Sequence, residues 1–160
     1  MPPAKKYPKD ADVIRTYAEL DQYATSFSQG HFDLLIVVGP AGIAKTVTMR
    51  HTLGEKAVWI QGSASPFGIY TTLYHNQGRP IVIDDVDGLL SDRAAVRMLK
   101  QLTSNEPRKT LSWITAAAGQ LDPTLPKEYT TTSKTAILCN EWQSLANANI
   151  AAVESRGHLV

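Results

Sequence analysis

The feature that most constrains this chain is a run of five aliphatic residues, Leu34–Val38, that ends directly in a glycine. A strand that is aliphatic at every position is typical of a parallel sheet with both faces covered. Two further short runs of the same character lie at residues 80–84 and 135–139. Because segments with helical spacing separate these runs, we expect an α/β fold in which two helical layers enclose a mostly parallel sheet.

The expected elements alternate along the chain, and we assign residues 11–160 to a single domain. Residues 1–10 are basic and contain proline, which favours a flexible lead-in over a nucleic-acid-binding arm. The first helix is expected to begin at a cap on Asp10 or Asp12 and to be closed by Gly30. Helices are predicted at residues 10–28, 46–53, 66–75, 92–102 and 144–153, strands at 34–38, 57–60, 80–84, 135–139 and 158–160, and hairpin arms at 109–115 and 129–133.

Composition excludes several classes of protein. The 160 residues carry 16 Lys and Arg against 15 Asp and Glu, a net charge of +1, so any contact with nucleic acid must be local. The longest apolar run has only five residues, far below the roughly 20 that span a bilayer, so no membrane association is expected. The single cysteine, Cys139, cannot form an internal disulfide. We therefore expect a cytoplasmic protein.

A glycine-containing loop follows the first strand and precedes a helix, with the sequence Gly-Pro-Ala-Gly-Ile-Ala-Lys-Thr at residues 39–46. Such a loop presents backbone N–H groups at the positive end of a helix, where a triphosphate binds. Lys45 is expected to reach the β- and γ-phosphates, and the Thr46 hydroxyl to bind Mg²⁺. Ala44 replaces the second glycine of the usual pattern, and its methyl group can crowd the phosphate. The predicted nucleotide-binding residues are Gly39, Pro40, Ala41, Gly42, Ile43, Ala44, Lys45, Thr46 and Val47.

A second motif ends the strand at residues 80–84 with two adjacent carboxylates, Asp84 and Asp85. Asp84 is placed to hold Mg²⁺ through water, and Asp85 to orient an attacking water molecule. The alternative is that both carboxylates cap the following turn together with Asp87. Because both motifs fall at strand ends on the edge of the sheet where α/β proteins bind ligands, we favour the first interpretation.

These motifs, followed by a strand that ends in Asn140, resemble the core of an AAA+ ATPase, a type of P-loop NTPase, over residues 31–160. The resemblance implies a three-layer α/β/α fold with a five-stranded sheet, ATP and Mg²⁺ as cofactors, and Asn140 as the sensor 1 residue beside the γ-phosphate. Ala44 is similar to the alanine in the phosphate loops of minichromosome-maintenance helicases and MoxR-type ATPases. Asp85 stands where most AAA+ members have Glu, and the Asp84-Asp85 pair resembles that of the bacterial replication initiator. Because Asp is one methylene shorter than Glu, slow hydrolysis is an open alternative.

The tripeptide Ser155-Arg156-Gly157 resembles the Ser-Arg-Cys motif of clamp loaders and the Asp-Arg of superfamily 3 helicases. The resemblance implies that Arg156 acts as an arginine finger in a neighbouring subunit's site, within a homo-oligomeric ring or filament. The alternative is a surface arginine paired with Glu154.

The segment at residues 109–133 resembles the hairpin that precedes the sensor strand in superfamily 3 helicases, which implies contact with single- or double-stranded DNA. Arg108 and Lys109 flank its base, Trp113 lies on one arm and Lys127 is near the other. A cation beside an aromatic ring suits single-stranded nucleic acid. Its tip is not basic, so a structural or inter-subunit hairpin is the alternative.

We therefore expect an ATP-hydrolysing AAA+ type motor core that acts as an oligomer on nucleic acid, as a helicase or replication-related remodeller in a phage- or plasmid-like setting. The predicted catalytic residues are Asp85, Asn140 and Arg156. The alternative is a slow or non-hydrolysing switch or scaffold that recruits a partner protein, as Ala44 and Asp85 suggest. A small-molecule kinase is disfavoured because no arginine-bearing lid segment is found. The expected core also lacks the C-terminal helical lid of most AAA+ proteins, so it is either excised from a longer chain or a minimal member.

Overall fold

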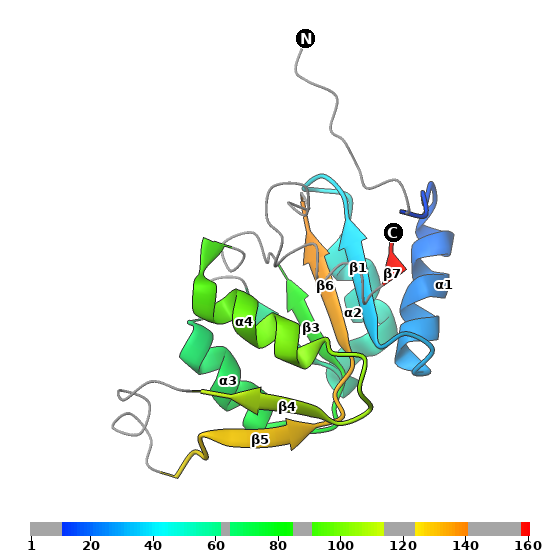
Figure 1. Cartoon of the computed structure of the whole chain (residues 1–160). Helices are drawn as coiled ribbons and strands as arrows, with labels where there is room; N and C mark the ends of the chain where they lie inside the picture. The colour runs from blue at the N-terminus through cyan, green and yellow to red at the C-terminus, as the bar shows by residue number, and fades with distance from the viewer. Residues whose placement is uncertain (1–10, 62–64, 85–90, 114–123, 141–157) are drawn as a thin grey trace.

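The computed structural model of the chain describes residues 11–61, 65–84, 91–113, 124–140 and 158–160. Helices and strands alternate through these residues (Figure 1). In chain order the elements are α1 (Tyr17–Ser28), β1 (Leu34–Val38), α2 (Lys45–Leu53), a short 3₁₀ helix (Gly54–Lys56), β2 (Val58–Gln61), α3 (Pro66–His75), β3 (Ile81–Asp84), α4 (Arg93–Leu102), β4 (Lys109–Ser112), β5 (Glu128–Thr131), β6 (Thr135–Cys139) and β7 (His158–Leu159).

The main sheet is parallel, in the order β2-β3-β6-β1-β7. Strand β6 lies between β3 and β1, and its register pairs Leu34 with Thr135 and Val38 with Cys139. The two-residue strand β7 pairs with β1 at the end of the sheet. Because all pairs are parallel, the carboxyl ends of β1, β3 and β6 meet at one edge (Figure 1). The prediction of an α/β fold with a mostly parallel sheet is confirmed.

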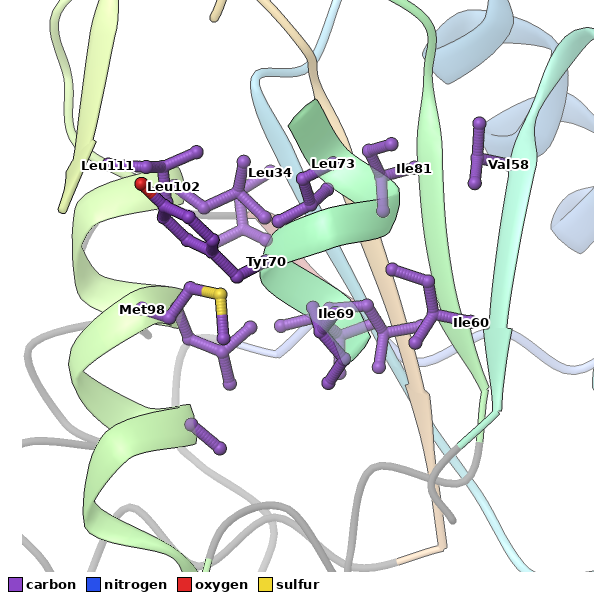
Figure 2. Close-up of a cluster of buried hydrophobic side chains, with 14 of the residues drawn as sticks. Leu34, Val58, Ile60, Ile69, Tyr70, Leu73, Ile81, Met98, Leu102 and Leu111 are labelled. Atoms are coloured by element: carbon purple, nitrogen blue, oxygen red, sulfur yellow. The ribbon is translucent and has the colours of Figure 1, made fainter. Parts of the chain in front are cut away.

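The two faces of the sheet bury two separate hydrophobic clusters, because successive side chains of a strand point to opposite faces. Leu34 and Ile36 of β1 belong to the cluster that α3 and α4 cover, and Leu35 and Val37 to the cluster beneath α1 and α2. In the first cluster, Met98 of α4 points towards Ile69 and Tyr70 of α3 (Figure 2). Two described helices on each face are compatible with a three-layer α/β/α fold.

Helix α1 begins later than expected. Thr16, and not Asp10 or Asp12, is the N-cap: its side chain accepts a hydrogen bond from the Glu19 backbone N–H, and the Glu19 carboxylate accepts one from the Thr16 N–H. This capping box satisfies two free donors at once, which a single aspartate upstream does not. The end was predicted well, since α1 stops at Ser28 and Gly30 follows with φ +83°.

Strands β4 and β5 form the antiparallel hairpin that the sequence predicts, with shorter arms and with residues 114–123 outside the described part. Aromatic packing holds it on α3: the Tyr129 ring lies 4.9 Å from that of Tyr70, and Trp113 lies 5.7 Å from Tyr70. The Tyr129 hydroxyl donates to the Tyr70 carbonyl, and the Tyr70 hydroxyl donates to the Pro126 carbonyl. Burial, reinforced by the neighbouring Tyr70, raises the pKa of Tyr129.

The remaining elements depart little from expectation. Helix α3 and strand β6 have the predicted bounds, and β2 is shifted by one residue. The helix predicted at residues 144–153 lies outside the described residues. Over the part of the chain that the structure covers, no helix is both long and apolar enough to cross a bilayer.

Candidate functional site

The loop after β1 leads into α2 through an unusual backbone conformation. Ala44, the N-cap of α2, has φ 55° and ψ 28°, the left-handed region that favours glycine. No side chain caps this helix, whereas Thr16, Ser65 and Asp92 cap α1, α3 and α4. The first-turn N–H groups of α2 therefore have no side-chain acceptor, and they form a positive helix end suited to an anion.

Two glycines make the loop geometry feasible. At Gly39 an added Cβ would lie 2.6 Å from the Ile43 Cδ1 atom, so any larger residue would displace the Ile43 side chain from the loop. Gly42 has φ +81°, which side-chain-bearing residues rarely adopt. The backbone conformation of the loop thus favours glycine at Gly42, whereas a larger residue at Gly39 would require only that the exposed Ile43 side chain move.

Thr46 and Asp84 bring the two sequence motifs together. The Thr46 Oγ1 atom, in the first turn of α2, donates to Asp84 Oδ2 at the end of β3 over 2.8 Å. A hydroxyl and a carboxylate oxygen are hard ligands of the kind Mg²⁺ takes, and Mg²⁺ sites use one or two carboxylates together with waters and phosphate oxygens. Among the described residues no group of three or more His, Cys, Asp or Glu gathers, so the oxygen donors at this point are the Thr46 hydroxyl and the Asp84 carboxylate.

Lys45 lies at the centre of the site and is only 8% exposed. Its Nζ atom donates to the Gly39 carbonyl at 2.7 Å, to the Pro40 carbonyl at 2.9 Å and to Asn140 Oδ1 at 3.3 Å. Asn140 reaches this point because β6 is paired with β1, and the Gly39 N–H donates to the Cys139 carbonyl at 3.1 Å. The two neighbouring strands therefore deliver Lys45 and Asn140 to the same place.

A cavity of about 320 Å³ opens between these groups. The predicted residues that line it are Ala41, Gly42, Ile43, Ala44, Lys45, Thr46, Asp84 and Asn140. Of the other predicted residues, Gly39 and Pro40 contribute the carbonyls that hold Lys45. Val47 does not line the cavity and is 68% exposed. Asp85 and Arg156 lie outside the described residues.

Sequence reasoning missed two groups of lining residues. Leu138 and Cys139 line the cavity although they belong to a buried strand, and the available signal was their position directly before Asn140. A second cavity of about 310 Å³ lies beside the loop, lined by Ile14, which precedes α1, and by Tyr17, the first residue of α1, and it shares Ile43 and Lys45 with the first cavity. No motif marks those residues, because chain folding alone brings the start of α1 to the loop.

The predicted nucleic-acid contacts around the hairpin are not all accessible. Lys109 is only 2% exposed, and its Nζ atom donates to the Ser133 carbonyl at 2.6 Å. Burial lowers the pKa of Lys109, and the nearby Lys134 lowers it further, whereas Asp33 raises it. Its placement as a nucleic-acid contact is therefore wrong: the stem crosses the hairpin base and the amine is enclosed. Arg108 and Lys127 are exposed.

Trp113 is half-buried and serves the hairpin instead of being displayed for stacking. Its ring lies 5.6 Å from Phe67 in an edge-to-face arrangement and packs at the border of the cluster beneath α3 and α4.

No protein-family model matches this chain, and no curated protein shows a significant match to it. The site must therefore be interpreted from its own geometry.

Proposed function

We propose that this chain is a P-loop NTPase core of the AAA+ type that binds ATP with Mg²⁺ and hydrolyses it. The observation that carries the proposal is the Thr46–Asp84 hydrogen bond at 2.8 Å, which joins the glycine loop to the end of β3. Two motifs far apart in the sequence meet at an uncapped helix N-terminus, beside a buried lysine. That combination of groups suits a phosphate chain with a bound cation better than a structural role.

The phosphate-binding groups come from the loop and from Lys45. The uncapped N–H groups at the start of α2 lie at the positive end of the helix dipole, where a negative charge is stabilised. Lys45 is held by two loop carbonyls and by Asn140. A phosphate oxygen is a stronger acceptor for an ammonium group than a carbonyl oxygen, because the hydrogen bond is then charge-assisted at both ends. Binding therefore exchanges the partners of Lys45 within the site.

Thr46 and Asp84 would hold Mg²⁺, which neutralises phosphate charge when it is bound. Asp85 is proposed to orient the attacking water, and Asn140, 3.3 Å from Lys45, to position that water beside the γ-phosphate. The second cavity supports the proposal that the ligand is a nucleotide, because it adjoins the loop and offers the apolar side chains of Ile14 and Tyr17 to a nucleobase.

The wider assignment extends beyond the described residues. We propose a cytoplasmic homo-oligomer in which Arg156 reaches the site of a neighbouring subunit, so that specific activity rises with protein concentration. The five-stranded sheet and the hairpin before the sensor strand support the AAA+ assignment. Action on nucleic acid, as a helicase or a replication-related remodeller, is part of the same proposal.

The test compares two threonines of α2. Thr46→Val removes the hydroxyl that bonds Asp84, whereas Thr48→Val makes the same change at a half-buried position that does not line the cavity. Calorimetry with ATP should show the Mg²⁺-dependent part of the affinity falling about tenfold or more for Thr46→Val and by less than about twofold for Thr48→Val. Equal behaviour of the two variants, or an unmodified chain that binds no Mg-ATP, would overturn the proposal.

A nucleotide-dependent switch that hydrolyses slowly and recruits a partner is the second candidate. The left-handed conformation of Ala44 favours it, because the methyl group lines the phosphate cavity at a position where glycine is the less strained residue. Asp85→Asn distinguishes the two functions in a steady-state turnover assay. The motor hypothesis expects turnover to fall about 100-fold with ATP binding kept, whereas unchanged turnover identifies the switch.

A further inference from the structure

The outward face of α4 carries a stripe of basic residues that the proposed nucleotide site does not use. Arg93, Arg97 and Lys100 are spaced by four and three positions, so they lie within about 60° of arc on one side of the helix. Arg93 and Arg97 are exposed, whereas Lys100 is half-buried and has a contact of its own, so the two arginines carry the argument. The opposite side of α4 packs into the core through Ala95, Val96, Met98, Leu99 and Leu102.

The stability of the helix does not explain these charges. Helix α4 contains no acidic residue, and Arg93 stands in its first turn, at the positive end of the helix dipole, where a cation is unfavourable. Within the described ranges neither Arg93 nor Arg97 forms an ion pair. The N-cap carboxylate of Asp92 accepts from the Ala95 N–H and so serves the helix end. A chain of net charge +1 thus concentrates positive charge on one exposed face.

The chemistry of this face selects its partner. Among the described residues the large exposed hydrophobic side chains are Val13, Tyr17, Ile43 and Val47, and none of them belongs to α4. A protein interface would need an apolar centre, which this face lacks. Insertion into a lipid surface would need the apolar side of α4, which is already buried in the core. The remaining partner for closely spaced arginines is a chain of phosphates.

We propose that the outward face of α4 binds the phosphodiester backbone of nucleic acid without reading its sequence. The two exposed arginines, Arg93 and Arg97, are about 6 Å apart along the helix axis, the length of about two nucleotides of one strand. The inference deepens the proposed function, on which it rests for its biological setting. It assigns the contact to α4 and not to the enclosed Lys109.

The position of α4 connects this surface to the rest of the molecule. Gln101 of α4 donates from Nε2 to Ser112 Oγ of β4 at 2.9 Å and accepts from the Ser112 N–H at 3.2 Å. These two hydrogen bonds attach strand β4 of the hairpin to α4. In the sequence, α4 is the next described helix after β3, which ends in Asp84. Nucleic acid bound to α4 would thus contact the described helix that follows Asp84, the proposed Mg²⁺ ligand, in the sequence.

The test is fluorescence anisotropy of labelled 30-nucleotide single-stranded DNA, 30-base-pair duplex DNA and single-stranded RNA, without ATP, over a range of salt concentrations. The variant Arg93→Gln/Arg97→Gln keeps good helix formers and removes two cations. Arg97→Gln alone is matched by Lys56→Gln, which removes one exposed charge next to α2, in the layer on the other side of the sheet. Circular dichroism and thermal unfolding check that each variant is folded.

The double variant is expected to lose at least about tenfold in affinity at 0.1 M salt, with a salt slope smaller by about 1.4 for single strands. Arg97→Gln should lose more affinity than Lys56→Gln. Comparing the three probes shows which strand form supplies the phosphates. Three outcomes overturn the inference: no binding of any probe by the unmodified chain, equal binding by the folded double variant, or equally tight binding of poly-glutamate, which would indicate an acidic protein partner.

A separate arm distinguishes this inference from the nucleotide site. Lys45→Met should bind DNA as the unmodified chain does, and the Arg93→Gln/Arg97→Gln variant should bind Mg-ATP normally. If neither the unmodified chain nor any variant binds Mg-ATP, but the unmodified chain binds DNA, the proposed NTPase is refuted and the α4 inference is retained. The reverse pattern would refute the α4 surface alone.

Discussion

The two ends of the parallel sheet each hold a buried lysine, and the two lysines have different surroundings. At the carboxyl edge, Lys45 is 8% exposed and donates to two loop carbonyls and to Asn140, next to a cavity of about 320 Å³. At the opposite end, Lys109 is 2% exposed and donates to the Ser133 carbonyl. There the Ser133 hydroxyl also accepts from the Gly78 N–H and from the Thr131 hydroxyl.

The difference teaches that burial of a lysine does not by itself mark a functional site. Both amines are desolvated and both are satisfied by carbonyl oxygens. Lys45 adjoins a cavity that Thr46 and Asp84 also line, whereas the polar groups around Lys109 bond to one another. Under the proposed function, phosphate oxygens would replace the partners of Lys45, whereas Lys109 closes a network that holds the hairpin to the start of β6.

The sharpest test of this comparison changes each lysine to methionine, which preserves most of the side-chain volume. Lys45→Met is expected to weaken Mg-ATP binding about 100-fold, because it removes the charge-assisted hydrogen bond between the ammonium group and a phosphate of ATP. Lys109→Met should change that affinity by less than about twofold. Calorimetric titration with Mg-ATP measures both, and a similar loss in both variants would show that the two ends are not functionally distinct.

The burial of Lys109 should affect the pH dependence of the free energy of unfolding. Because burial lowers the pKa of Lys109 below its ordinary 10.5, the unfolded chain binds more protons than the folded chain between the two pKa values. The free energy of unfolding contributed by this residue should therefore rise with pH in that interval, and Lys109→Met should remove the rise. Urea unfolding of both proteins from pH 7 to 10 gives the difference, in which the ionisation of Tyr129 cancels. Parallel curves would contradict the enclosed position of the amine.

The smallest expected effect concerns backbone strain at Ala44, in the loop at the carboxyl edge of the sheet. Ala44→Gly should raise stability by up to about 1 kcal/mol, because glycine adopts φ 55° without the steric cost of a Cβ. Ala41→Gly is the matched control, since Ala41 is exposed in the same loop and its φ is not positive. Thermal unfolding should show Ala44→Gly melting a few degrees higher and Ala41→Gly no higher than the unmodified chain. The opposite order would mean that the loop relaxes away from the left-handed conformation.

The sequence by itself determined most of the described helices and strands, and it placed the polar residues Thr46, Asp84 and Asn140 at the ends of those elements. The aliphatic run Leu34–Val38 predicted a strand buried on both faces, and glycine placement predicted the loop before α2. Local signals were sufficient because a helix cap, a tight turn and a doubly buried strand each depend on a few neighbouring residues. The start of α1 was the exception, where the Thr16–Glu19 capping box outweighed the aspartates upstream.

Only the tertiary structure decided which polar groups meet and which are enclosed. The pairing of β6 between β1 and β3 brings Asn140 to Lys45, and it sets Thr46 against Asp84. The same packing encloses Lys109, although the sequence placed it beside the exposed Arg108, and it turns Arg93 and Arg97 outward. Exposure depends on contacts between segments far apart in the chain, and no local pattern records those contacts.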